Sequence, residues 1–343
     1  MTQNRPREPA KCREPEPLPV LAPGELPERD ENRRWLVEGL WPVEGVGIVG
    51  GQAKSWKTWM ALDLAVSVAS RTPCIGAFPT CVSGRVLVYA AEDSLPDIRA
   101  RLAGICRNRA TSLESLNLGV IAVDRLHLNR PDDKDRLEAT LDNEKPVLLV
   151  LDPFVRLHSS IDENSAGDVS AILGDLRRLQ RRHGVAIALV HHARKNGNGM
   201  RPGQALRGSS DFHAWGDVNL YLRRKEDIAI LIVEHRSAAS PKPLSIELSA
   251  GPKGECPALR AITGPRECDL TARREEEYEL RDQLLKALAS SSAPVPQRKL
   301  RKEVQRRNKT VSEALAQLQA EGLVRHTPKG WTENSGQQLR LAM

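Results

Sequence analysis

The sequence of 343 residues is poor in aromatic residues, and it has no paired cysteine pattern and no long apolar run. Phe, Trp and Tyr make up only 3% of it, which argues against an RNA-binding module built on stacked aromatic side chains. The six cysteines include no CxxC pair, and this scatter fits a reducing compartment better than a zinc or disulfide framework. No run approaches the ~18 apolar residues of a membrane span, and the polar N-terminus lacks a signal-peptide core. These absences predict a cytoplasmic protein that does not enter a membrane.

The overall composition is typical of a folded, basic protein. Hydrophobic residues make up 40% of the chain, and the formal net charge is +7, which favours an anionic partner without identifying it. The length is sufficient for two domains. Residues 1–30 are rich in Pro and Glu and are predicted to be a disordered tail, because they cannot bury enough apolar surface to offset chain entropy.

Near-continuous apolar runs alternate with helical patterns between residues 31 and 250. The runs at 45–50, 84–92, 146–152, 184–192 and 217–224 are typical of parallel strands that helices cover on both faces. The segments "WMALDLAVSVAS" and "VSAILGDLRRLQRRHG" carry apolar residues at helical spacing. This alternation predicts an α/β domain with a central, mostly parallel sheet. The runs at 228–236 and 244–250 predict a terminal hairpin-like extension.

A second, smaller domain is predicted at residues 271–335, after a linker rich in Gly and Pro at 251–270 and before a tail at 336–343. Helices are expected at about 272–289, 297–306 and 310–321, followed by a hairpin around Pro328. This order resembles the winged-helix DNA-binding domains. Its basic segment offers Arg298, Lys299 and Arg301 as DNA contacts, although the winged-helix fold also serves to dock proteins.

The stretch "VGGQAKSWKTWMALDLA" has the layout of a phosphate-binding loop between a strand and a helix. Such a loop points backbone N–H groups at the phosphates, and its lysine reaches the β- and γ-phosphates while a hydroxyl binds Mg²⁺. Lys57 and Thr58 stand at the required spacing from Gly51. The predicted nucleotide-binding residues are Gly51, Gln52, Ala53, Lys54, Ser55, Trp56, Lys57 and Thr58, with ATP and Mg²⁺ as the cofactors.

Trp56 departs from the phosphate-loop pattern, which has glycine before the lysine. Because the helix is expected to begin here, we expect helical dihedrals that any L-residue can adopt. The indole is then expected to lie outward, beside the base of the nucleotide or a neighbouring subunit. Its effect on nucleotide affinity is left open.

Polar side chains stand at the ends of three predicted strands, which is the edge where open α/β sheets bind ligands. Asp152 ends "VLLVLD" and is predicted to hold Mg²⁺ through water. Glu92 ends "VLVYAAE" and is a candidate base for the attacking water. His191 or His192, at the end of "ALVHH", is a candidate γ-phosphate sensor. Taken singly, each has a plainer interpretation as a helix cap, a solvated strand end or a core histidine.

Several blocks together resemble the RecA-like ATPases typified by the plasmid RepA hexameric helicases. These blocks are "GGQAKSWKT", "AAEDS", "LVLDPFVRLH", "LVHHARK" and "GQALRGSSDFHAWGD", within about residues 35–250. The resemblance implies a RecA-type core, in which Glu92 is the catalytic base, Asp152 the Walker B aspartate and His192 the sensor. It also implies that Arg207 is an arginine finger that completes the site of an adjacent subunit, so a homo-oligomeric ring, as in a hexamer, is expected.

Two segments between these blocks, 156–168 and 195–208, have the composition of loops. In RecA-like rings the corresponding loops face the channel and hold single-stranded DNA. Arg194, Lys195 and Arg201 are therefore candidate phosphate contacts. The alternative is a solvated loop whose charges only aid solubility.

The function that these features predict is a Mg²⁺-dependent ATPase that acts on DNA, in its specific form a RepA-like replicative helicase of a plasmid, phage or other mobile element. One alternative is a RecA- or KaiC-like ATPase for DNA repair or loading that does not unwind DNA. Another is a nucleotide-sensing regulator in which the winged helix binds DNA and hydrolysis is slow or absent.

Overall fold

The structure is a computed structural model of the whole chain. It describes residues 18–26, 28, 30, 34–159, 166–192, 211–249, 257–262, 268–291, 293–306 and 308–334. Within these ranges the side chains of residues 166, 268–278 and 309 are not described.

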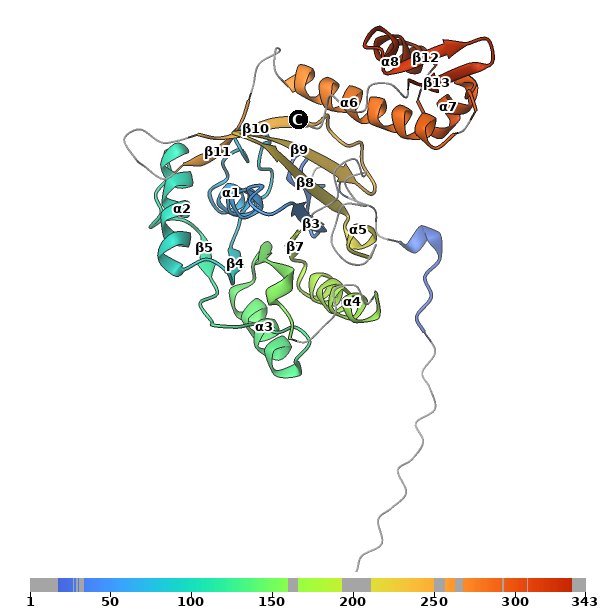
Figure 1. Cartoon of the computed structure of the whole chain (residues 1–343). Coiled ribbons are helices and arrows are strands. Elements are labelled where there is room, and N and C mark those ends of the chain that lie inside the picture. The colour runs from blue at the N-terminus through green and yellow to red at the C-terminus, as the bar shows by residue number, and fades with distance from the viewer. Residues whose placement is uncertain are drawn as a thin grey trace, which may run out of the picture.

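A nine-stranded sheet forms the centre of the described part of the chain (Figure 1). Its spatial order is β11-β10-β9-β8-β3-β7-β6-β4-β5. From β8 to β5 all neighbouring strands are parallel, and β9, β10 and β11 are added antiparallel at one side. The predicted fold class, α/β with a mostly parallel central sheet and an antiparallel extension, is confirmed. In chain order the strands are β3 (Val46–Gly51), β4 (Val86–Ala90), β5 (Leu118–Val120), β6 (Leu148–Asp152), β7 (Ala186–His192), β8 (Val218–Lys225), β9 (Ile228–His235), β10 (Leu244–Ser249) and β11 (Ala258–Ala261).

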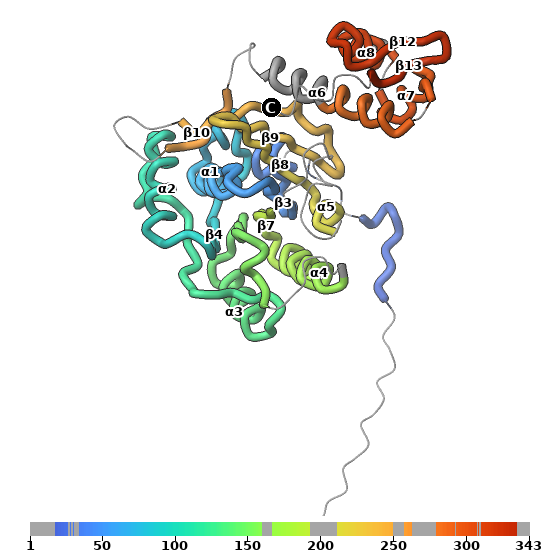
Figure 2. Tube along the Cα trace, viewed as in Figure 1, coloured from blue at the N-terminus to red at the C-terminus, as the bar shows by residue number. Residues whose placement is uncertain are grey.

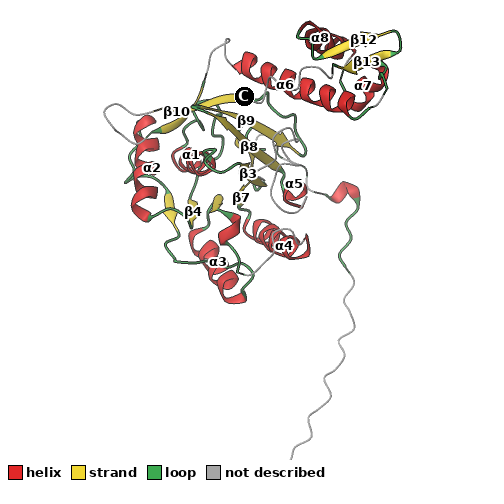
Figure 3. Ribbon diagram, viewed as in Figure 1, coloured by secondary structure: helices red, strands yellow, loops and turns green. Residues whose placement is uncertain are grey.

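Helices cover the parallel part of the sheet on both faces (Figure 3). On one face α1 (Lys57–Ser70) and α2 (Leu95–Asn108) pack in the first hydrophobic core. On the other face α3 (Pro131–Glu144), α4 (Ala166–His183) and the short α5 (Asp211–Trp215) pack in the second. The β3 strand therefore lies inside a three-layer sandwich, and all six of its residues are buried.

The parallel strands are buried because their sequences are apolar at successive positions and so suit two covered faces. All five residues of β6, Leu148–Asp152, are buried, and the aspartate is the last of them. Helix α4 buries a stripe at three- and four-residue spacing, as its sequence predicts. The stripe consists of Val169, Ile172, Leu173, Leu176 and Leu179.

Smaller elements complete this part of the chain. An antiparallel pair, β1 (Trp35–Val37) and β2 (Trp41–Pro42), precedes β3. A 3-10 turn, η1 (Pro23–Glu25), lies before that pair, and a second one, η3 (Phe154–Arg156), follows β6. Within the segment predicted as a linker, Ala258–Ala261 forms β11 at the edge of the sheet, and residues 251–256 and 263–267 lie outside the described residues.

The C-terminal segment contains three helices and a hairpin around a third hydrophobic core of its own. The elements are α6 (Cys268–Ala289), α7 (Gln297–Glu303), α8 (Asn308–Ala320), β12 (Val324–Thr327) and β13 (Gly330–Glu333). Val311, Leu315 and Leu318 of α8 are buried in this core, as their spacing predicts. Figure 2 traces the chain through these elements. Among the helices of the described residues, none has both the length and the apolar character needed to span a bilayer.

Candidate functional site

The segment between β3 and α1 is shaped to receive an anion. A Cβ on Gly51 would lie 2.4 Å from Ser55 Oγ and 2.6 Å from the Leu222 carbonyl oxygen, so only glycine fits where the chain leaves the sheet. Among the described residues, the backbone amides of Ala53, Lys54 and Trp56 have no protein acceptor. Free amides at the start of a helix form the cradle that phosphate-binding loops use.

Trp56 differs from the sequence-based expectation in both conformation and position. Its φ of 69° and ψ of 25° are left-handed, so the expectation of helical dihedrals is wrong. The residue is only 9% exposed and belongs to the core that α1 shares with the sheet, so the outward placement is also wrong. The loop must reverse direction just before α1 and requires at this position the conformation that glycine ordinarily supplies. The indole remains buried because the first core accommodates it.

Lys57 and Asp152 are both buried beside the loop. Lys57 is 5% exposed, and its Nζ donates to the Gln52 carbonyl oxygen at 2.6 Å. Burial lowers the pKa of Lys57 to about 8, against the opposing effect of the Asp152 and Glu92 carboxylates. Burial likewise raises the pKa of Asp152 to about 6, against a hydrogen bond from Thr58 and the charge of Lys57. The predicted Mg²⁺ residues Thr58 and Asp152 are therefore in direct contact.

The two acidic residues that follow β4, Glu92 and Asp93, lie in different environments. Asp93 is held by Arg101 through two hydrogen bonds of 2.7 and 2.9 Å. The predicted base Glu92 accepts a single hydrogen bond of 3.2 Å from Arg156 Nε, and its side chain is 43% exposed. Glu92 is thus accessible to water. Arg156 was not among the predicted site residues, because only the fold brings η3 beside the end of β4.

The two histidines at the end of β7 face opposite sides of the sheet. The His191 ring stacks on Phe212 with 4.0 Å between the ring centroids, and it meets Phe154 edge-on with 5.8 Å between the centroids. The residue is 1% exposed and lies among the side chains of the second core. His192 follows the alternation of β7 onto the face of α1, and it pairs with Gly51 of β3 in the register. The structure therefore brings His192 to the face that carries the phosphate loop and places His191 in the core.

Several predicted residues lie away from this cluster or outside the described residues. Arg194, Lys195, Arg201 and the predicted arginine finger Arg207 belong to residues 193–210, which are not described. The predicted DNA contacts Arg298, Lys299 and Arg301 are all exposed on α7.

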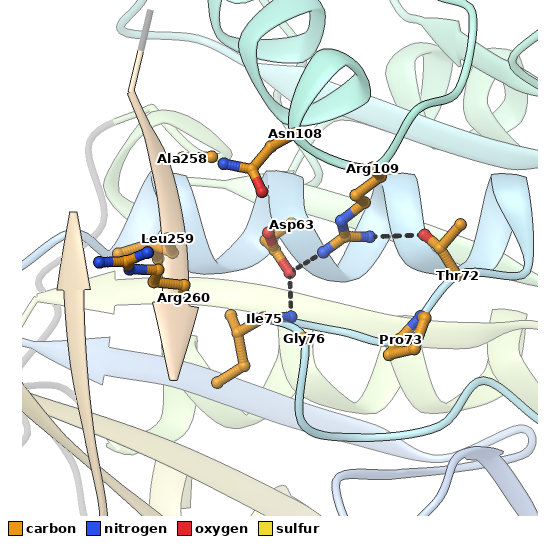
Figure 4. Close-up of a pocket in the computed structure, with 10 residues that line it drawn as sticks. All are labelled: Asp63, Thr72, Pro73, Ile75, Gly76, Asn108, Arg109, Ala258, Leu259 and Arg260. Carbon is orange, nitrogen blue, oxygen red and sulfur yellow. Dashed lines mark hydrogen bonds and ion pairs between the residues drawn. The ribbon is translucent and has the colours of Figure 1, made fainter. Parts of the chain in front are cut away.

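A cavity of about 260 Å³ lies farther along α1, and no residue predicted for the site lines it (Figure 4). Its floor contains Asp63, whose Oδ1 accepts hydrogen bonds from the Ile75 amide at 2.6 Å and from Arg109. Arg109 also donates to Thr72 Oγ1 at 3.0 Å. Asp63 is 1% exposed. The buried ion pair ties α1 to the turn after it and to the end of α2.

The residues present fit a nucleotide with a divalent cation. The loop supplies free amides and a buried ammonium group for phosphate oxygens, and Thr58 and Asp152 supply the oxygen ligands that Mg²⁺ prefers. Ser55 Oγ is also buried with no hydrogen-bond partner in the described part of the chain. A buried donor without an acceptor is expected where a ligand completes the site.

This fold and this loop together define a P-loop nucleotide-binding domain. The profile of a family described as an AAA domain (AAA_25) matches residues 12–198, which is more than half of the chain. The protein belongs to this AAA domain family. No curated protein matches it.

Two solved structures are similar in outline. The RadB recombinase is 15% identical with a TM-score of 0.46, and the match covers 64% of this chain and 91% of the recombinase. A DnaB-like replicative helicase, solved in a study of its interactions with primase, is 13% identical with a TM-score of 0.45. That match covers 63% of this chain and 59% of the helicase, so this chain spans less than two thirds of the helicase's length.

Proposed function

We propose that the protein is a Mg²⁺-dependent ATP hydrolase that acts on DNA as a RepA-like replicative helicase of a plasmid, phage or other mobile element. The observation that carries the ATPase assignment is the Lys57 ammonium group, buried beside the Asp152 and Glu92 carboxylates and next to the free amides of the loop. Burying charged groups costs folding stability through desolvation, so their presence here indicates that a bound ligand interacts with them.

The arrangement supports a division of roles among the site residues. When a nucleotide binds, Lys57 gives up its hydrogen bond to the Gln52 carbonyl oxygen and donates to phosphate oxygens instead. The loop amides orient these phosphate oxygens. Thr58 and Asp152 hold the cation, which when bound neutralises charge on the phosphate oxygens. Glu92 takes the proton from the attacking water. His192 donates a hydrogen bond at the γ-phosphate position.

The assembly and DNA parts of the proposal rest on sequence features. Arg207 is assigned as the finger that stabilises the transition state in an adjacent subunit, which requires a ring, here a hexamer. Arg194, Lys195 and Arg201 are assigned to single-stranded DNA in its channel. The C-terminal unit is proposed to be a winged helix that contacts duplex DNA, and the exposure of Arg298, Lys299 and Arg301 supports this role.

The test is ATP turnover measured with and without single-stranded DNA. DNA should stimulate the wild-type protein, and Lys57→Ala should abolish nucleotide binding and turnover. Glu92→Gln should lose turnover by a factor of about 10² or more while it still binds ATP. Glu144→Gln, which removes an exposed carboxylate from α3, is the matched control and should match the wild type.

Two further measurements test the finer assignments. Arg207→Ala should remove turnover and spare nucleotide binding, and unchanged turnover would show that this arginine is not a finger. Strand displacement on a forked duplex separates a helicase from a repair or loading ATPase, which would hydrolyse ATP without releasing the strand.

One observation favours a second candidate, the nucleotide-sensing regulator. Glu92 Oε1 accepts a hydrogen bond from Arg156 Nε at 3.2 Å, and a carboxylate oxygen occupied in this way is less available to hydrogen-bond the attacking water. If this pair persists with ATP bound, the wild-type protein should bind ATP tightly and hydrolyse it slowly. Arg156→Gln should then increase turnover, whereas a motor ATPase should already turn over rapidly in the presence of DNA.

A further inference from the structure

The phosphate loop contains two residues in a conformation that disfavours any side chain. Lys54 has a φ of 62° and Trp56 a φ of 69°, and both lie in the left-handed region, where Cβ crowds the backbone. Such conformations persist only where surrounding contacts determine them. Because glycine is absent at both positions, the contacts that hold this loop must come from elsewhere in the fold.

The end of β8 supplies those contacts because it extends past the end of β3. Gly51, the last residue of β3, pairs with Leu222, and β8 continues to Lys225. Leu222 belongs to the core on the α1 face. Arg224 is two residues farther on and therefore points to the same face, directly beside the loop.

Arg224 makes three contacts there through one planar guanidinium group. Its Nη1 donates to the Lys54 carbonyl oxygen at 3.1 Å. Its Cζ lies 4.4 Å from the centroid of the Trp56 ring, a cation–π geometry. Its Nε donates to the Glu226 carbonyl oxygen at 2.7 Å, which fixes the side chain to the turn between β8 and β9.

We propose that Arg224 is a positioning residue that holds Lys54 and Trp56 in the left-handed conformations needed for the anion cradle. It thereby supplies through a side chain what a glycine at position 56 would supply through its own backbone. This inference rests on the proposed function insofar as the cradle binds ATP, but the conformational role of Arg224 exists without a nucleotide.

The first experiment uses the full chain without nucleotide or Mg²⁺. Hydrogen exchange is compared for the wild type, Arg224→Gln and Arg223→Gln at the amides of Ser55 and Met60, which donate to the carbonyl oxygens of Gln52 and Trp56. Arg223 is the matched control, since it points to the opposite face and pairs with Glu279 at 2.9 Å. Arg224→Gln should accelerate exchange of these two hydrogen-bonded amides about tenfold, which corresponds to about 1.4 kcal/mol. Equal exchange in all three proteins would overturn the proposal.

The second experiment is a double-mutant cycle on ATP affinity, measured by calorimetry. Arg224→Gln should weaken ATP binding about tenfold and raise KM while kcat stays within about twofold, because Arg224 orders the loop before ATP binds. In a background that carries both Lys54→Gly and Trp56→Gly the same substitution should change affinity by less than about twofold, since glycine needs no support at either φ.

The outcomes of the cycle distinguish positioning from direct contact. An equal loss of affinity in both backgrounds would mean that Arg224 touches the nucleotide itself, and the positioning role would be wrong. If the wild-type protein binds no ATP, the proposed function fails, and the exchange experiment still decides the role of Arg224. That experiment needs no glycine variant, so it stands even if the protein with Lys54→Gly and Trp56→Gly does not fold.

Discussion

Lys57 is buried as an ammonium group at a cost in stability that should be measurable in the nucleotide-free protein. Its folded-state pKa of about 8 lies below the ordinary value of 10.5. The unfolded chain therefore binds more protons between these values, and stability rises as the pH increases through that window. Below pH 8 the full cost is present.

Lys57→Met should accordingly raise the free energy of unfolding at pH 7 by about 1–3 kcal/mol while it abolishes ATP binding. The gain should vanish as the pH approaches 11, where Lys57 is neutral in both states. Urea denaturation without Mg²⁺ at pH 7, 9 and 10.5 measures this trend. Lys242→Met, at an exposed position, should show no such gain, and a loss of stability at pH 7 in Lys57→Met would contradict the argument.

At the scale of elements, helix α1 is anchored by the buried ion pair between Asp63 and Arg109, whose side chains are 1% and 10% exposed. Removing one partner of such a pair leaves an uncompensated buried charge, so Asp63→Ala should destabilise the protein by about 3–5 kcal/mol. The exposed pair of Arg85 and Glu144 provides the contrast. Glu144→Ala should change stability by about 0–1 kcal/mol. Chemical denaturation of both variants compares them, and equal effects would show that burial does not govern these pairs.

The elements that the sequence predicts are those whose pattern is local. The strands around the phosphate loop are continuous apolar runs, and α4 has a clear stripe, so their positions follow from periodicity. Helix α3 was not predicted, because it is mostly charged and buries only Asp133, Leu137 and Leu141. Strand β11 lies in a segment rich in Gly and Pro, and only its pairing with β10 makes it a strand.

The same distinction applies to the candidate site. Lys57, Thr58 and Asp152 follow from spacing and strand ends, which are properties of the local sequence. The conformation of Trp56 and the contacts of Arg156 and Arg224 depend on neighbours that are distant in sequence. Sequence periodicity does not predict this conformation or these contacts. The two arginines are brought to the site only when the sheet has assembled.

At the scale of the whole molecule, the basic helix α7 belongs to a unit whose core is separate from the cores of the sheet. If these residues make the proposed DNA contacts, replacing Arg298, Lys299 and Arg301 by glutamine should weaken duplex binding and reduce the slope of log affinity against log salt by roughly 3. ATP turnover without DNA should be unchanged.

The control for this prediction removes the same charge from the other unit. Arg130, Arg136 and Lys145 are exposed at α3 and its ends, and their replacement by glutamine should leave the salt slope unchanged. Fluorescence anisotropy of a labelled duplex at several salt concentrations measures both variants. Equal slopes in the two variants would argue that α7 docks a protein rather than DNA.

The burial of an indole within the phosphate loop has an optical consequence. Indole emission responds to charge near the ring, and the guanidinium carbon of Arg224 lies 4.4 Å from the centroid of the Trp56 ring. ATP should therefore change the intrinsic fluorescence of the unlabelled protein as it enters the loop, and Trp56→Phe should remove most of that change. The chain would then report its own occupancy in real time, which makes stopped-flow measurement of nucleotide arrival and release possible without a dye.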